Sequence, residues 1–267
     1  MEGTETTPRW GSEPIDPRGF NLPSLKARYI IDHLPHTGSV LEIGSGSGKF
    51  LRTLTVQRPE LRVHGCDIAD WEAPDPDIEF RVMERDIPYA DASFDAVLVV
   101  DVLEHVPDPA HLLDEARRVL KPGGRFIGFV PIEGEPRSLY ALYKRLLGDD
   151  LYVRTKHHVQ AFTHAGLSRL LEERFQIVDT SHAYHVLGHA MDATFFAAAH
   201  LPQLQKFWWR DNKYYAGDAA PQSPFVFALN RLLELGNALA YLESRLLAKH
   251  RLGVAALLFE ARVPASV

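Results

Sequence analysis

Short apolar runs alternate with helical patterns along most of this sequence, and this alternation restricts its fold more than any other feature. We interpret seven runs as β-strands, at residues 39–43, 62–66, 79–83, 94–100, 125–130, 175–180 and 253–262. Periodic apolar positions predict helices at residues 22–34, 49–57, 109–120 and 163–174. Because strands that alternate with helices form βαβ units, the sequence predicts an α/β fold with a mainly parallel, doubly wound sheet.

The charge balance argues against a nucleic-acid-binding protein. The chain of 267 residues holds 29 Lys and Arg against 35 Asp and Glu, a formal net charge of -6. A large nucleic-acid interface needs clustered cations that displace counterions from phosphates. The one cysteine, Cys66, excludes an internal disulfide, and we find no secretory signal and no apolar run long enough to span a membrane. We therefore expect a cytoplasmic protein that does not act on nucleic acid.

The pattern divides the chain into a core and two further segments. Residues 1–20, rich in Pro, Gly, Thr and Glu, predict a flexible leader. The strands and helices above place a core at residues 21–185 and 251–267. The interval 186–250 breaks the alternation, and we interpret it as a helical cap inserted between the sixth and seventh strands.

The predicted cap contains two long helical patterns, at residues 190–209 and 225–249, on either side of a stretch with Gly, Pro and Asp at 212–224. The second pattern is broadly apolar. Its polar positions form one narrow stripe, at Asn230, Glu234, Asn237, Tyr241 and Arg245. Such a helix must cover the sheet, a partner subunit, an apolar substrate or a membrane surface. The aromatic stretch 207–215 could stack nucleic-acid bases, but packing or an interfacial position fits the acidic chain better.

Residues 40–49, with the sequence VLEIGSGSGK, carry the strongest chemical signal. A strand ends and a helix begins here, and Gly44, Gly46 and Gly48 let the backbone turn tightly and approach a ligand with no Cβ in the way. Such glycine turns also occur where nothing binds. The G-x-G-x-G spacing, and Glu42 two residues before the first glycine, favour a ligand site.

This turn resembles motif I of the class I S-adenosylmethionine-dependent methyltransferases. Four later segments resemble further motifs of that family in the same order, namely HGCD at 64–67, VMERDIPY at 82–89, VVDVLEHV at 99–106 and LKPGG at 120–124. The resemblance implies a seven-stranded Rossmann-like sheet in the order 3-2-1-4-5-7-6, with only strand seven antiparallel. It also implies S-adenosyl-L-methionine as the cofactor.

The residues that would contact the cofactor follow from the same resemblance. Asp67, which closes the second strand, would accept hydrogen bonds from the ribose hydroxyls, although it could instead cap the next element. The position that usually holds the adenine-binding acid has Met83, so Asp86 or the backbone around Arg85 would serve there. The full predicted set is Glu42, Gly44, Ser45, Gly46, Gly48, Asp67, Ile68, Arg85, Asp86, Asp101 and Val102.

His105 is the candidate catalytic residue. It stands beside Glu104 after the fourth strand, where the resemblance places the transfer site, and an imidazole titrates near neutral pH, as a general base requires. The two side chains could equally well only orient the loop. With Asp101 and a distant histidine they could also bind a metal, since this set partly resembles the metal ligands of small-RNA 2′-O-methyltransferases and the Glu-His pair of quinone O-methyltransferases. Many relatives share such residues without a metal, so we expect none.

Other histidines have weaker claims to a function. His158, with His157 before it, could line the acceptor pocket or belong to a helix entry. His182, His185 and His189 have a spacing that fits one helical face and could hold a metal, but some of the 13 histidines will cluster by chance. We expect no metal here either.

Together these interpretations predict methyl transfer, with O-methylation favoured because His105 could act as the base. The apolar cap points to a hydrophobic or lipid-linked small molecule as the acceptor and is compatible with a peripheral membrane contact. We expect a monomer or a homodimer. The alternatives are a non-catalytic scaffold protein with the cofactor fold, a nucleic-acid methyltransferase, and a nicotinamide oxidoreductase. The last is disfavoured because Lys49 replaces the third glycine of the dinucleotide fingerprint.

Overall fold

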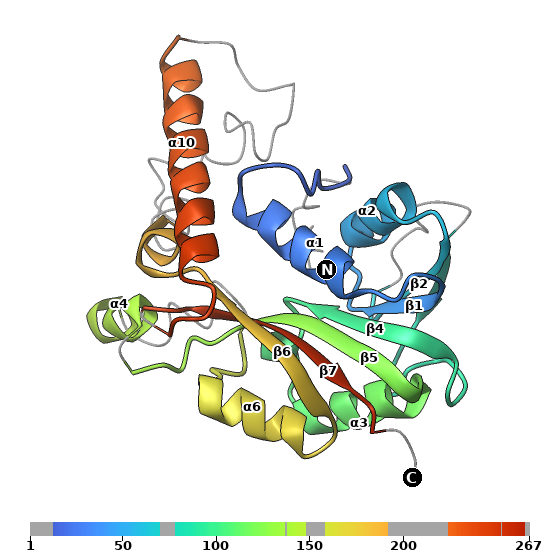
Figure 1. Cartoon of the computed structure of the whole chain (residues 1–267). Coiled ribbons are helices and arrows are strands. Elements are labelled where there is room, and N and C mark those ends of the chain that lie inside the picture. Colours follow the sequence, from blue (N-terminus) through green and yellow to red (C-terminus); the bar gives the residue numbers. More distant parts are fainter. Residues whose placement is uncertain are drawn as a thin grey trace, which may run out of the picture.

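One sheet forms the centre of the computed structural model, which describes residues 13–69, 78–136, 138–147, 158–191, 224–251 and 253–264. Its strands are β1 (Gly38–Ile43), β2 (Leu61–Asp67), β3 (Glu79–Val82), β4 (Phe94–Val100), β5 (Leu120–Pro131), β6 (Gln176–Ala183) and β7 (Ala256–Arg262). Their order is β3-β2-β1-β4-β5-β7-β6 (Figure 1). The first five strands pair in parallel, and β7 runs antiparallel to both its neighbours. This arrangement confirms the predicted sheet.

Helices cover both faces of the sheet. The described helices are α1 (Leu22–His33), α2 (Lys49–Gln57), the short 3-10 helix η1 (Leu103–His105), α3 (Pro109–Val119), α4 (Leu139–Leu147), α6 (His164–Glu172) and α10 (Pro224–Leu246). α1 and α2 lie on one face, and α3 and α6 lie on the other (Figure 1). The sheet is therefore the middle layer of three, with an apolar core on each side.

The central strand β4 shows why two cores form. Val97 and Val99 are buried in the core that includes α3 and α6, whereas Ala96 and Leu98 are buried in the core that includes α1 and α2. Successive side chains of a strand point to opposite faces, so a strand covered on both faces is apolar at nearly every position. This double burial accounts for the continuous apolar runs in the sequence.

Most element boundaries lie within a few residues of the predicted ones, and β5 shows the largest extension. It begins at Leu120, not at residue 125, because Leu120 pairs with Phe94 ahead of a register shift. The LKPGG segment is therefore part of the strand. Gly123 within it has a φ of +74°, a left-handed conformation that glycine adopts without steric cost.

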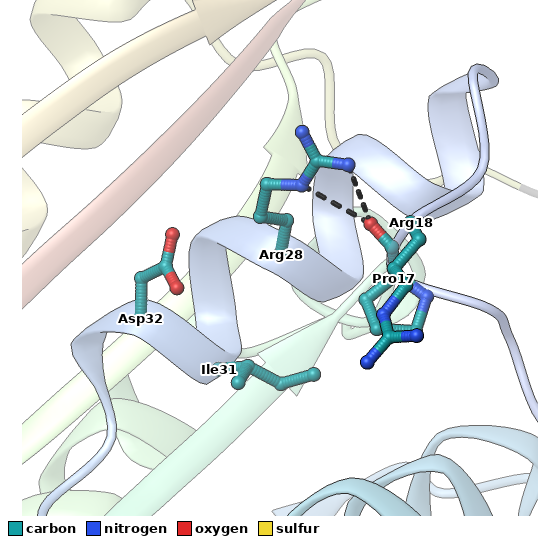
Figure 2. Close-up of a pocket in the computed structure, with 5 residues that line it drawn as sticks. All are labelled: Pro17, Arg18, Arg28, Ile31 and Asp32. Carbon is teal, nitrogen blue, oxygen red and sulfur yellow. Dashed lines mark hydrogen bonds between the residues drawn. The ribbon is translucent and has the colours of Figure 1, made fainter.

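The described part of the predicted leader, residues 13–20, is packed against α1 and α2. The Ile15 N–H donates to Thr53 Oγ1 at 2.8 Å, and Arg28 Nε and Nη2 donate to the Pro17 carbonyl at 3.1 and 2.7 Å. Figure 2 shows the Arg28 bonds beside an open hollow that is lined by Pro17, Arg18, Arg28, Ile31 and Asp32. These bonds connect residues 13–20 to α1 and α2. Residues 1–12 lie outside the described residues, and the flexible leader stays a prediction.

α10 packs against α1 through small and polar side chains. Ala240, Tyr241 and Ser244 are at most 3% exposed, and the Tyr241 hydroxyl accepts a hydrogen bond from Arg28 Nη1. The apolar stripe of α10 faces outward, with exposures of 47% to 72% at Leu232, Leu235, Leu239, Leu242 and Leu246. The polar stripe thus supplies the Tyr241 contact that attaches the helix.

Only part of the predicted cap can be compared with the structure. Residues 186–191 are helical. The rest of the pattern at 190–209 and the aromatic stretch 207–215 lie outside the described residues. Among the helices in the described ranges, none combines the length and apolarity needed to cross a membrane.

Four buried histidines gather beside β6. The rings of His164 and His182 stack with their centroids 5.2 Å apart, and His185 and His189 are fully buried. His182 belongs to β6, which extends to Ala183 in its pairing with β7, so the prediction that His182 shares a helical face with His185 and His189 is wrong. Burial lowers the pKa of His182 to about 4, and it also lowers the pKa of His164.

We expect the fold to lose stability as the pH falls below about 6.5. The unfolded chain protonates His182 near its ordinary pKa of 6.5 and the folded chain near 4, so the unfolded state binds more protons between these values. The free energy of unfolding should therefore fall by up to about 1.4 kcal/mol per pH unit in this window. Urea unfolding at several pH values measures this slope.

His182→Asn is the matched variant. The asparagine amide can still donate toward the Ala248 carbonyl, which lies 3.2 Å from His182 Nδ1, but it does not titrate. We expect a shallower pH dependence for this variant. A slope equal to that of the unsubstituted chain would show that His182 is not responsible.

Candidate functional site

The turn between β1 and α2 is built from left-handed glycines. The φ angles of Gly44, Gly46 and Gly48 are +68°, +50° and +73°. Residues with a Cβ adopt this region at a cost of about 1–2 kcal/mol. A Cβ on Gly44 would stand 2.6 Å from a methyl of Val102, so the turn contacts the segment after β4, whereas a Cβ on Gly46 would meet no described atom within 4 Å. The turn is therefore closed toward β4 and open at Gly46.

Hydrogen bonds fix this turn to the end of β2. The N–H groups of Gly44 and Ser45 donate to the Cys66 carbonyl at 2.8 and 3.2 Å, and the Gly46 N–H donates to Asp67 Oδ2 at 2.8 Å. Asp67 Oδ1 accepts from the Ala69 N–H at 3.1 Å. The structure thus brings together the glycines and Asp67, as the sequence predicted, and gives Asp67 the further role of holding the turn.

Two buried polar atoms in the turn lack a hydrogen-bond partner among the described residues. They are Glu42 Oε2, in a side chain that is 4% exposed at the end of β1, and Ser45 Oγ in a side chain that is 7% exposed. Burial raises the pKa of Glu42 well above its ordinary value, and the nearby Asp67 carboxylate raises it further. A buried polar group without a partner costs about 1–3 kcal/mol, so these atoms mark a place where a polar ligand would bind favourably.

The segment after β4 begins with a strained aspartate. Asp101 has a φ of +54°, which is uncommon outside glycine and clusters at functional sites. Its N–H donates to the Phe129 carbonyl at 3.1 Å, and its carboxylate accepts from Lys26 Nζ at 2.5 Å. Lys26 also stands 3.7 Å from the centre of the Phe129 ring. Sequence reasoning missed Lys26, because no local motif links α1 to the end of β4.

Just beyond Asp101, three side chains that can bind a metal come together. One ligand atom from each of Glu104, His105 and His158 lies within 4.8 Å of the others. The two imidazole rings form an edge contact with centroids 4.8 Å apart. His158 Nδ1 lies 2.8 Å from Oε2 of Glu133, a residue that follows the end of β5. Neither Glu133 nor the proximity of His158 to His105 was predicted, since these residues are far apart in sequence.

Glu104 is the most buried member of this group. Its side chain is 1% exposed, and neither carboxylate oxygen has a hydrogen-bond partner among the described residues. Burial raises the pKa of Glu104 well above its ordinary value, with the Asp101 and Glu133 carboxylates acting in the same direction. His105, the predicted base, is exposed beside it.

The residues predicted for adenine are more dispersed. Asp86 is exposed, with its carboxylate 2.9 Å from His111 Nε2 at the start of α3, and Arg85 is also exposed. Met83 is buried in the core at 7% exposure. Ile68 is 76% exposed directly after Asp67. Ile68 is therefore next to Asp67, which is hydrogen-bonded to the glycine turn. Within the described residues, no hydrogen bond connects Asp86 to that turn.

Comparison with known proteins identifies the segment that carries the glycine turn, Asp67 and residues 101–105. Residues 41–128, which run from β1 into β5, match the family described as a methyltransferase domain. Residues 41–128 thus match a methyltransferase domain. The seven-stranded sheet of the chain is the Rossmann-like arrangement of this fold, and S-adenosylmethionine is the cofactor that the domain implies.

Curated relatives of the methyltransferase domain are partial matches. A ubiquinone biosynthesis O-methyltransferase of Xylella fastidiosa is 30% identical over 158 residues, which cover 52% of this chain and 61% of that protein. A demethylmenaquinone methyltransferase of Tropheryma whipplei is 36% identical over 115 residues, covering 40% and 46%. A 27-O-demethylrifamycin SV methyltransferase of Amycolatopsis mediterranei is 35% identical over 121 residues, covering 40% and 44%. The match thus spans about half of each relative's length.

Solved structures share the fold across most of the chain. A geranyl diphosphate C-methyltransferase of Streptomyces coelicolor, in complex with Mg²⁺, geranyl diphosphate and S-adenosyl-L-homocysteine, has a TM-score of 0.54 at 15% identity, covering 90% of this chain and 78% of its own. A [4+2]-cyclase has a TM-score of 0.58 at 18% identity, covering 97% and 87%. Chains with different names therefore share this fold, and the fold alone does not define the reaction.

Two observations show that the glycine turn at residues 44–48 is suited to S-adenosylmethionine. Space is open at Gly46, so a ligand can approach the backbone there. Glu42 and Ser45 add buried polar atoms that lack partners among the described residues. The cofactor carries hydroxyl and amino groups that can satisfy such atoms.

Gly46→Ala should weaken the binding of S-adenosylhomocysteine by about tenfold or more, equivalent to about 1.4 kcal/mol. The added methyl group would stand in the open space where we place the cofactor. Isothermal titration calorimetry measures the Kd.

Gly123→Ala is the matched control, because Gly123 also has a left-handed φ, +74°, and a Cβ there would also meet no described atom within 4 Å. Both variants should lose similar stability, about 1–2 kcal/mol. Only Gly46→Ala should lose affinity, and equal Kd values for the two variants would remove the turn from the cofactor site.

Proposed function

We propose that the chain is an S-adenosylmethionine-dependent O-methyltransferase that acts on a hydrophobic or lipid-linked small molecule. The observation that carries this proposal is the contact between the glycine turn and the segment after β4. A Cβ on Gly44 would touch Val102, and Glu104 and His105 follow within three residues. A cofactor at the turn would thus lie next to polar side chains that can handle the proton of a hydroxyl acceptor.

The cofactor supplies a methyl group that is already activated on a sulfonium sulfur. The backbone of residues 44–48, with Glu42 and Ser45, is our assignment for holding it. Asp67 is assigned to the ribose, because each oxygen of its carboxylate accepts one N–H and retains capacity for a second bond. Ile68, Asp101 and Val102 flank this site in the proposal. The bond from Asp86 to His111 makes the backbone around Arg85 the better candidate for adenine.

The protein then has two main tasks in our proposal. It aligns the acceptor with the methyl group, and it assists the removal of the proton from the acceptor hydroxyl. The ends of parallel strands meet at one edge of a sheet, where ligands of such folds bind. Glu104 and His105 stand at the end of β4, and Glu133 stands at the end of the adjacent β5. This position suits His105 for a direct role at the acceptor hydroxyl.

The outward leucines of α10 support an apolar acceptor. Half or more of the surface of most of these side chains is exposed, although the helix is attached through its polar side. The names of the relatives point the same way, since two refer to isoprenoid quinones and one to rifamycin. We therefore assign the segment 186–250 as a cap that recognises the acceptor.

A methyl-transfer assay tests the reaction class. The full chain is incubated with S-adenosylmethionine labelled in its methyl group and with a panel of apolar phenols, catechols and hydroxyquinones. We expect label on oxygen in at least one prenylated or otherwise extended member, identified by mass spectrometry of the product. Tight binding of S-adenosylhomocysteine with no transfer to any oxygen, nitrogen or carbon acceptor would instead favour the scaffold alternative.

Leu235→Gln, Leu239→Gln and Leu242→Gln, combined in one variant, test the cap. These side chains are 57%, 47% and 51% exposed, so the substitutions should cost little stability. Loss of apolar contact should raise KM for the acceptor by about tenfold or more, given roughly 25 cal/mol for each Å² of apolar surface.

The control for this variant is Val178→Gln, which changes a 49% exposed valine on β6. The Kd for S-adenosylhomocysteine should stay unchanged in both variants. If the leucine variant keeps the KM and kcat of the unsubstituted chain, α10 has no part in recognition of the acceptor.

A further inference from the structure

Glu104, His105 and His158 form a compact group at the edge of the sheet where we place the acceptor. Their ligand atoms lie within 4.8 Å of one another. Two ligands at about 2.2 Å from one ion can be at most about 4.4 Å apart, so an ion would draw these side chains slightly closer together. The group combines one carboxylate with two imidazoles. It comes from two separate segments, the η1 turn and the chain just before α6.

Glu104 provides an independent argument for a cation site. Its side chain is 1% exposed, and both carboxylate oxygens are buried without a hydrogen-bond partner among the described residues. Lys26, the nearby cation, is paired with Asp101 instead. A buried carboxylate without a donor or a counter-ion is costly, and metal coordination is one of the few ways to compensate it.

His158 has the outer partner that metal-binding histidines usually have. Its Nδ1 lies 2.8 Å from Glu133 Oε2, and the Glu133 side chain is 2% exposed. A carboxylate that accepts from one ring nitrogen fixes the ring and raises the basicity of the other nitrogen. We accordingly assign Nε2 of His158 as its ligating atom.

Backbone hydrogen bonds hold the group together without any ion. The N–H groups of Val159 and Gln160 both donate to the Glu104 carbonyl, at 2.9 and 3.0 Å. The Gly134 N–H donates to the Phe162 carbonyl at 2.8 Å and ties the same segment to the end of β5. The ligands are therefore positioned in advance, which lowers the entropic cost of binding.

We propose that Glu104, His105 and His158 bind a divalent transition-metal ion, for which Zn²⁺ is the best fit, and leave a coordination position open for the oxygen of the acceptor. Two imidazoles and a carboxylate with an open position form a catalytic type of zinc site. This assignment makes His105 a ligand in place of the base predicted from the sequence. Only the identity of the open-position ligand rests on the proposed function.

The chemical consequence is a more acidic acceptor hydroxyl. Coordination to the ion lowers the pKa of a bound O–H group, as it does for water. The O–H bond breaks, the proton passes to solvent water, and the electron pair stays on the oxygen. The oxygen is then the stronger nucleophile that attack on an activated methyl group requires, and no protein base is needed.

Zinc binding by the full chain, without a histidine tag, tests the site directly. The protein is treated with a chelator, desalted and titrated with Zn²⁺ in competition with a chromophoric chelator. We expect one equivalent to bind. His105→Ala and His158→Ala should each weaken binding by about 100-fold or more, and Glu133→Gln, which changes only the outer partner, by about 10- to 100-fold.

His36→Ala, which removes an exposed histidine between α1 and β1, is the control and should bind Zn²⁺ as the unsubstituted chain does. The Kd for S-adenosylhomocysteine and the circular dichroism spectrum should be unchanged in each variant. His105→Ala disturbs packing least because His105 is exposed, so it decides the question if His158→Ala fails to fold. Failure of the unsubstituted chain to bind Zn²⁺, or equal affinity in His105→Ala, would overturn the proposal.

The outcomes separate this inference from the proposed function. Methyl transfer that persists in the presence of chelator, by a protein that binds no Zn²⁺, would keep the methyltransferase and discard the metal site. Stoichiometric Zn²⁺ binding by a protein that transfers no methyl group would keep the site and discard the assigned reaction. Transfer that chelator abolishes and Zn²⁺ restores is the result that we expect.

Discussion

Hydrogen bonds from the β1–α2 turn to the end of β2 are the interaction on which the rest of the site depends. Three successive N–H groups, of Gly44, Ser45 and Gly46, donate to the Cys66 carbonyl and the Asp67 carboxylate. The turn can present them in this way because its glycines adopt left-handed φ angles. The same geometry presses Gly44 against Val102 and leaves space at Gly46. These bonds thereby fix the glycine turn, the Asp67 carboxylate and the segment after β4 relative to one another.

The sheet could be predicted from the sequence because its signals are local. β4 is apolar at nearly every position since both its faces are covered, and helix-forming periods separate the strands. The glycine spacing and Asp67 lie within about 25 residues of each other, so their joint position follows from one βαβ unit. The family resemblance then supplied the strand order. The resemblance did not predict the hydrogen-bond partner of Asp86, one of the residues assigned to adenine, which is bonded to His111.

The features that sequence reasoning missed depend on contacts between distant segments. His158 lies beside His105 only because Val159 and Gln160 donate to the Glu104 carbonyl, and Glu133 joins them from β5. The orientation of α10 also depends on a contact between segments that are distant in sequence. Its sequence defined a polar stripe and an apolar side, and in the structure Tyr241 of the stripe bonds to Arg28 of α1, whereas the leucines face outward. Hydrophobic pattern defines the two sides of a helix, but tertiary polar contacts decide which of them packs inward.

The central claim is that the cofactor binds in the glycine turn, next to Glu104 and His105, which follow β4. A crystal structure of the chain grown with S-adenosylhomocysteine measures this most directly. Our account predicts density for the ligand against the backbone at Gly46, with the ribose hydroxyls within hydrogen-bond distance of Asp67 and the sulfur facing the Asp101–His105 side. Ligand density elsewhere, for example in the hollow of α1 beside Arg28, with an empty turn, would contradict it.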